Sequence, residues 1–186
     1  MYWPLPPLKS VTLAALLPLA ACKPPAADEY LERDDAVDVR VAPSTPVASP
    51  DTADAVWAPV AEGDRLLFGN PGERAFIALI CEAKGGRPHL RLARNVPADA
   101  RAKALFALIG NGHVERLPMD AVWTGSEWRW EGLFSADDPR LEVFTGPRMV
   151  EATLPGAGSV MINPSTLPGQ FIARCQSGGA PARPVQ

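Results

Sequence analysis

Between residues 57 and 176, strong turn signals divide the chain into short apolar segments, and this spacing most limits its fold. Residues 75–83 (AFIALICEA) form a continuous apolar run of strand length, which the turn sequence KGG at 84–86 ends. Residues 89–94 then alternate apolar and polar side chains, which is typical of a half-buried strand beside the first. The pattern predicts seven or eight short antiparallel strands, folded as a small β-sandwich or barrel-like domain with one or two short helices.

Residues 98–109 (ADARAKALFALI) fit two structures. Their strong helix formers and helical periodicity favour a helix. The segment leads directly into Gly110-Asn111-Gly112, however, and Asn-Gly between apolar runs is the strongest short hairpin signal. We therefore expect a strand over residues 103–109 that pairs with residues 113–117.

The remaining segments of this region complete the expected domain. Residues 121–123 and 127–133 predict one hairpin, and residues 148–153 and 159–162 predict another. Asp137-Asp138-Pro139 favours the start of a short helix, because proline suits the first helical position. Residues 165–175 close the domain as a short helix or a final strand.

The first 21 residues have the composition of a secretory signal. Lys9 is their only charge, and residues 11–19 form an apolar stretch that is too short to span a bilayer. The stretch ends in Leu19-Ala20-Ala21-Cys22, which resembles the lipobox of bacterial lipoproteins. That resemblance implies cleavage before Cys22, acylation of Cys22 and stable membrane anchoring. An ordinary cleavable signal with a cysteine nearby is the alternative.

The resemblance also implies a location. Residue 23 is lysine rather than aspartate, which in this family implies the outer membrane, facing the periplasm, with the inner membrane as the alternative. Residues 23–56 contain eight acidic and three basic side chains and five prolines. Such a segment cannot bury enough apolar surface to offset its chain entropy. We therefore expect a lipidated, disordered tether over 22–56, a β-rich domain over 57–176 and a disordered tail over 177–186.

The sequence contains three cysteines, for which two different roles are expected. If Cys22 is acylated, Cys81 and Cys175 remain, and an even pair in an oxidising compartment predicts a disulfide. Two separate buried thiols are the alternative. Two cysteines with two distant histidines match no zinc-binding spacing, so no metal and no cofactor are expected.

Charge argues against nucleic acid as a partner. The whole chain has a formal charge of −3. Within residues 57–176, thirteen acidic side chains balance thirteen basic ones. A neutral domain gives no electrostatic reason to bind an anionic polymer. Basic residues cluster in the sequence between positions 87 and 103, and a solvated strand face explains the cluster best. Its members are Arg87, Arg91, Arg94, Arg101 and Lys103.

No catalytic constellation emerges from the sequence. Neither Gly-x-Ser-x-Gly nor His-Glu-x-x-His occurs. Asp137 and Asp138 could hold Ca²⁺ or act as acid and base, but a helix cap explains them better. His89 is expected at a solvated edge, and His113 beside the Asn-Gly turn. A hairpin turn is the preferred explanation of the glycine-rich residues 156–159.

The candidate binding patch combines tryptophan with arginine, two residue types that are frequent in binding hot spots. Its predicted members are Trp123, Trp128, Trp130, Arg116 and Arg129. Trp128 and Trp130 fall on one strand face, with Trp123 across the hairpin. An aromatic core cluster is the competing explanation.

The sequence thus predicts a non-catalytic envelope lipoprotein whose periplasmic β domain has a binding or structural role. Its expected partners are the membrane, through the N-terminal lipid, and an envelope protein. A periplasmic hydrolase or a small-molecule carrier with a site that lacks a sequence motif is the alternative.

Overall fold

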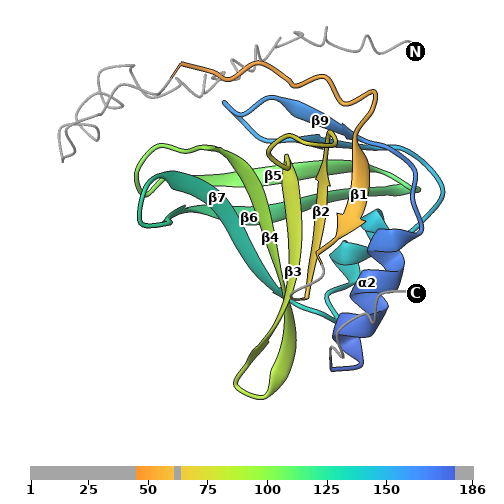
Figure 1. The fold of residues 1–186 in the computed structure, drawn as a ribbon. Coiled ribbons are helices and arrows are strands. Elements are labelled where there is room, and N and C mark those ends of the chain that lie inside the picture. The colour runs from red at the N-terminus through yellow and green to blue at the C-terminus, as the bar shows by residue number, and fades with distance from the viewer. Residues whose placement is uncertain (1–44, 61–63, 179–186) are drawn as a thin grey trace, which may run out of the picture. The chain divides into compact units, whose positions relative to one another are not determined.

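The computed structural model describes residues 45–60 and 64–178, which form one nine-stranded sheet and two short helices (Figure 1). The strands are β1 (Val56–Pro59), β2 (Arg65–Gly69), β3 (Ile77–Lys84), β4 (Arg87–Pro97), β5 (Lys103–Gly110), β6 (His113–Trp123), β7 (Trp128–Ser135), β8 (Val150–Thr153) and β9 (Ser159–Ile162). The helices are the 3-10 helix η1 (Pro139–Phe144) and the α-helix α2 (Leu167–Gln176). This confirms the predicted class, mainly antiparallel β with short helices. In the described residues, no helix is long and apolar enough to cross a membrane.

The strand order is β1-β2-β3-β4-β7-β6-β5-β8-β9, and each strand runs antiparallel to its neighbours. The sheet curls into a nearly closed barrel (Figure 1). Because neighbouring strands alternate in direction, four connections meet at one end of the barrel, which we call the turn end. These connections are residues 70–76, 98–102, 124–127 and 154–158.

The β5–β6 hairpin decides between the two structures that residues 98–109 allowed. β5 pairs with β6 from Lys103↔Asp120 to Gly110↔His113, so the strand prediction is confirmed. Asn111 and Gly112 link the strands with φ angles of 51° and 87°. Both central turn residues therefore have the positive φ that the tight turns favoured in hairpins require.

The barrel interior is filled by side chains. The alternation of β-strands sends one side of each strand inward, and η1 adds its own apolar residues to the same cluster. The largest buried members include Phe68, Phe106, Trp130, Phe134, Leu141 and Phe144. Burial of each such side chain contributes roughly 1.5–3 kcal/mol, so this cluster is the main source of stability.

Residues 45–55 close the gap between the two edge strands, which corrects the predicted boundary at residue 56. The amide of Val47 donates to the carbonyl oxygen of Gly156 at 2.9 Å. The side-chain amide of Asn163 donates to the carbonyl oxygens of Thr52 and Ala55 at 2.9 and 2.8 Å. Hydrogen bonds to its backbone attach most of this segment to the barrel, and Ala55 is its one side chain in the apolar core, so its composition resembles that of a tether. The rest of the predicted tether and the signal segment lie outside the described residues.

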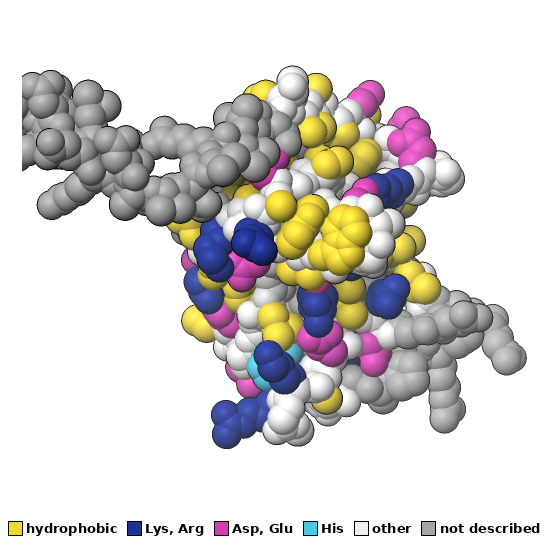
Figure 2. All heavy atoms as spheres, turned by 90° about the vertical axis from the view of Figure 1, so that its left-hand side faces the viewer, with side chains coloured by type: hydrophobic (Ala, Val, Ile, Leu, Met, Phe, Trp, Pro, Cys, Tyr) yellow, Lys and Arg dark blue, Asp and Glu magenta, His cyan; other side chains and the backbone are white. Residues whose placement is uncertain are grey.

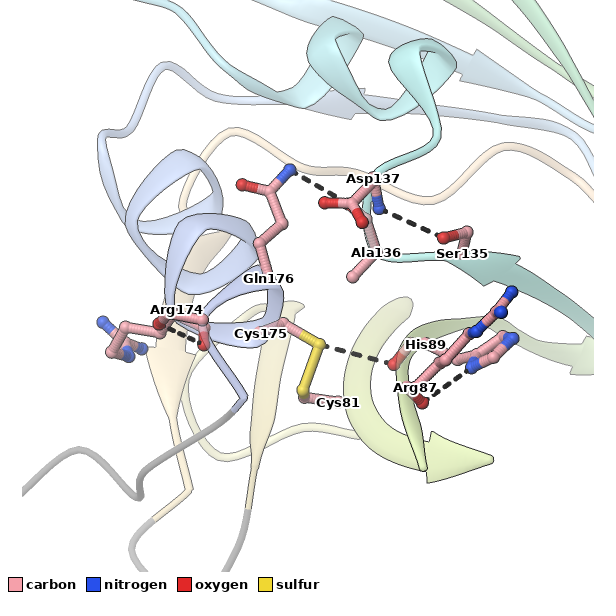
Figure 3. The surroundings of a disulfide bond; sticks show 10 residues. Cys81, Arg87, His89, Ser135, Ala136, Asp137, Arg174, Cys175 and Gln176 are labelled. Atoms are coloured by element: carbon pink, nitrogen blue, oxygen red, sulfur yellow. Dashed lines mark hydrogen bonds between the residues drawn. A yellow bond between two sulfur atoms is a disulfide. The ribbon is translucent and has the colours of Figure 1, made fainter. Parts of the chain in front are cut away.

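The disulfide between Cys81 and Cys175 is confirmed, and it attaches α2 to β3 (Figure 3). Their Cα atoms are 5.6 Å apart, and the two residues are separated by 94 positions. The side-chain amide of Gln176 also donates to the carbonyl oxygen of Ala136 at 3.0 Å. Residues 165–175, for which helix and strand were both open, thus end in a helix that is covalently fixed to the sheet.

Candidate functional site

Two tryptophans pair at the turn end of the barrel. Trp123 ends β6 and Trp128 begins β7, and the register places them directly opposite each other. Their ring centroids are 5.8 Å apart, with the ring planes tilted by 53°. Trp123 remains 52% exposed, whereas Trp128 is partly buried. Figure 2 faces this end of the barrel and shows hydrophobic side chains near its middle, with Lys and Arg side chains around them.

The connection between these strands is a tight turn. The amide of Thr124 donates to the carbonyl oxygen of Glu127 at 2.9 Å, and Gly125 has a φ of 99°. The carboxylate of Glu127 also pairs with the guanidinium of Arg74 in the 70–76 connection. The Arg74 hydrogen bond is the largest cause that lowers the pKa of Glu127. The tryptophan pair is therefore displayed on a turn that is fixed at its base.

Trp130 belongs to the core rather than to the surface. It follows Trp128 on the inward side of β7 and is only 6% exposed. The predicted shared face of Trp128 and Trp130 is present, but it points into the barrel. For Trp130 the competing explanation, an aromatic core cluster, holds.

The register places Arg94 opposite Trp130, on the inner side of β4. Its side chain is 3% exposed and donates to the carbonyl oxygens of Phe76 and Ala157 at 3.1 and 3.2 Å. Burial lowers the pKa of Arg94 to about 10, and the described residues offer its Nε no acceptor. The prediction of a solvated face is therefore wrong for Arg94. Strand parity was the available signal, because Arg94 shares the inward parity of Leu90 and Leu92.

Arg129 faces away from the tryptophans, on the outside of β7. Its Nε donates to Glu131 at 2.7 Å, and Arg91 donates to the same carboxylate at 2.6 Å. Arg91 also pairs with Glu82 at 2.9 Å. Burial opposes ionisation of Glu131, which is 6% exposed, but the two arginines outweigh it and the pKa of Glu131 is lowered. Arg129 thus belongs to a cross-strand ion network on the outer surface.

Arg116 is also remote from the tryptophan pair. It lies on the outward side of β6, seven residues before Trp123, which corresponds to about 23 Å of strand. Of the five residues in the predicted patch, the structure therefore brings only Trp123 and Trp128 together at the surface. The sequence could not show this, because closeness along the chain does not give the face or the end of a strand.

The other polar residues that the sequence singled out have structural contacts. The carboxylate of Asp138 accepts from the amide of Arg140 at 3.0 Å and caps η1, as predicted. The Arg140 side-chain hydrogen bond is the largest cause that lowers the pKa of Asp138. His89 Nδ1 lies 3.0 Å from the carbonyl oxygen of Arg87, and His113 Nδ1 lies 4.0 Å from Glu115. The glycine-rich 154–158 segment forms the β8–β9 turn, as predicted.

A groove of about 270 Å³ lies between η1 and α2. Polar and apolar side chains both line it, and the polar ones are Asp137, Asp138, Glu142, Thr145 and Gln176. The described residues contain no group of three or more His, Cys, Asp or Glu side chains that could hold a metal ion. Comparison with protein-family models, curated proteins and solved structures finds no match for this chain.

Proposed function

We propose that this chain is a lipid-anchored protein of the bacterial envelope, and that its barrel is a binding module rather than an enzyme. The anchor would be the acylated Cys22, which the lipobox-like sequence at 19–22 supports. The Cys81–Cys175 disulfide agrees with this location, because disulfides persist in oxidising compartments such as the periplasm. Pairing of these two cysteines leaves Cys22 available for acylation.

The observation that carries the binding role is the exposure of Trp123. A tryptophan that is 52% exposed leaves a large apolar surface in water, and a partner that covered this ring would recover its hydrophobic free energy. Trp128 supports the ring from one side, and the Arg74–Glu127 ion pair fixes the turn beneath it. Rigid aromatic anchors of this kind are the usual centres of protein interfaces. We therefore assign the partner contact to Trp123 at the turn end.

The anchor is tested by fractionating cells that express the full chain or its Cys22→Ser variant. We expect the wild-type chain in the membrane fraction, with the mass of a chain that begins at Cys22 and carries acyl groups. Cys22→Ser should appear in the soluble periplasmic fraction. An unprocessed wild-type chain, or the same distribution for both chains, would contradict the anchor.

The binding role is tested separately by photo-crosslinking in intact cells. A photoreactive residue replaces Trp123 in one variant and Met149 in the other, because Met149 is similarly exposed at 48% but precedes β8 at the opposite end of the barrel. We expect a discrete adduct from position 123 and none from position 149. Equal labelling from both positions would remove the assignment to the turn end, whatever the result for the anchor.

A further inference from the structure

The outer face of β5 and β6 carries large apolar side chains that the described chain leaves uncovered. Leu105, Ile109 and Val114 are 52%, 51% and 60% exposed. The register pairs Ile109 with Val114 and Leu105 with Pro118, so these side chains form one continuous stripe. Met161 on β9, which is 38% exposed, continues the apolar surface beyond β8. This surface lies on the barrel wall and is separate from the turn end.

Two opposite charges stand in this apolar surface. Arg116 lies between Val114 and Pro118 on β6, and it has no hydrogen bond or ion pair within the described part of the chain. Glu151 lies on β8, opposite Ile109 in the register. Arg116 and Glu151 are two strands and one side-chain row apart, about 12 Å by ordinary strand spacings. In the described part of the chain they form no ion pair with each other.

We propose that a second copy of this chain packs on this face, outer sheet against outer sheet, through a two-fold interface. A two-fold axis that passes over β5 in the plane of the interface would place each Arg116 opposite Glu151 of the second copy. One self-complementary face would then satisfy both charges, and Leu105, Ile109 and Val114 would be buried between the copies. Self-complementarity of this kind is the defining property of two-fold interfaces.

The area available sets the strength of this dimer. Two strands of about eight paired residues and two strands of four, all about 4.8 Å apart, present roughly 400 Å² per copy. Stable interfaces bury about 800 Å² per partner, so the dimer should be weak and reversible in solution. A strongly apolar, obligate dimer is not expected from this face.

Sedimentation equilibrium of the full chain tests the proposal. The chain carries Cys22→Ser, so that no lipid contributes to the mass and the result does not depend on the anchor. Between about 1 and 200 µM, the range where weak interfaces assemble, we expect the mass to rise from one chain towards two. Ile109→Glu should weaken association at least about tenfold, because it places a charge in the centre of the buried stripe. Val56→Glu is the matched control, since Val56 is 53% exposed but lies on β1.

A charge exchange tests the arrangement of the two copies. Arg116→Glu and Glu151→Arg should each weaken the dimer, because each change puts like charges opposite one another. The double variant should restore association, and circular dichroism should show that all variants are folded. A chain that stays monomeric throughout this range, as it would if a different protein covered the face, overturns the proposal. Association that survives Ile109→Glu, or a double variant that stays dissociated, overturns it as well.

Discussion

The guanidinium of Arg94 reaches across the barrel interior and donates to the carbonyl oxygen of Ala157 at 3.2 Å. The same side chain donates to Phe76 at 3.1 Å, so one buried cation joins β4 to both the β8–β9 turn and the start of β3. No carboxylate accompanies it in the described interior. Hydrogen bonds to backbone carbonyls are therefore what offsets the desolvation of this charge.

Arg94→Met should loosen the 154–158 turn. Hydrogen bonds from a charged donor contribute about 1.5–3 kcal/mol each, but removal of a desolvated cation offsets much of their loss. We expect the global free energy of unfolding to change by less than about 2 kcal/mol, while amide exchange in the turn rises about tenfold. Hydrogen exchange with mass spectrometry compares amide exchange in the turn with exchange in the rest of the barrel. Arg65→Met, at an exposed arginine, is the control. Unchanged exchange in the turn would contradict this role.

Glu131 predicts a pH dependence of stability. Its folded-state pKa is lowered by Arg91 and Arg129, so its contribution is present above the ordinary pKa of 4.5 and is lost as pH falls through the lower folded value. Glu131→Gln should therefore destabilise the protein by about 1–3 kcal/mol at pH 7, and by less at pH 3. Urea unfolding across this range measures the difference. Glu142 is exposed, so Glu142→Gln is the control, and its free energy of unfolding should differ little from that of the wild type at either pH. If Glu131→Gln is destabilised equally at pH 7 and pH 3, the prediction is contradicted.

The tryptophans should separate into surface and core. Trp130→Ala removes a buried ring and should cost about 3–5 kcal/mol of folding free energy. Trp123→Ala should cost less than about 1.5 kcal/mol, because this ring is half exposed. Iodide quenching of fluorescence provides an independent measurement, since Trp123 is the most exposed of the four described tryptophans and Trp123→Ala should remove their most accessible emission. Equal destabilisation by both substitutions would contradict the assignment of Trp123 to the surface.

The Cys81–Cys175 disulfide should be a large contributor to stability. It closes a loop of 94 positions, for which loop-closure entropy gives about 4–5 kcal/mol. The double variant Cys81→Ser, Cys175→Ser should therefore melt well below the wild type under oxidising conditions. In the presence of reductant the two proteins should melt close together. The same melting temperature for both oxidised proteins would refute the prediction.

Two glycines should respond to alanine in opposite directions. A Cβ at Gly132 would stand 2.7 Å from the carbonyl oxygen of Pro118 and from the ring of Phe134, so Gly132→Ala should cost about 1–3 kcal/mol. At Gly169 in α2, the nearest atoms belong to Thr145 at an ordinary contact distance of 3.5 Å. Gly169→Ala should therefore stabilise the helix by about 0.5–1 kcal/mol. Thermal unfolding measures the change in stability for each variant. A change of the same sign for Gly132→Ala and Gly169→Ala would be inconsistent with this packing.

Local signals in the sequence predicted the elements well. The Asn111-Gly112 turn outweighed the helical periodicity of residues 98–109, because a two-residue turn fixes the pairing of both flanking strands. Asp138 before Pro139 predicted the start and the cap of η1. In these cases the cause of the structure lies within a few residues of the signal.

Features that depend on distant contacts were missed. The attachment of residues 45–55 depends on Asn163, which follows β9 more than 100 residues later. The predicted binding patch combined Arg116 with Trp123, although the strand separates them along its length. The alternation of side chains along β4 could have placed Arg94 inside the barrel. Its charge alone suggested a solvated position. Which side chains meet is decided by curvature and register, and a single sequence does not state either.

The attachment of residues 45–55 also determines how the barrel would respond to a mechanical load. A pull on residue 45 reaches Val47 and Gly156 first, then Ser49 and Ser159, and then Asn163, before it reaches the β1–β2 ladder. These contacts would open one after another before the strand ladder, and Ala55 is the one side chain of this segment that would leave the apolar core. The disulfide holds the opposite end of the chain and carries none of this load at first. Under load, residues 45–55 would thus detach and extend before the barrel unfolds.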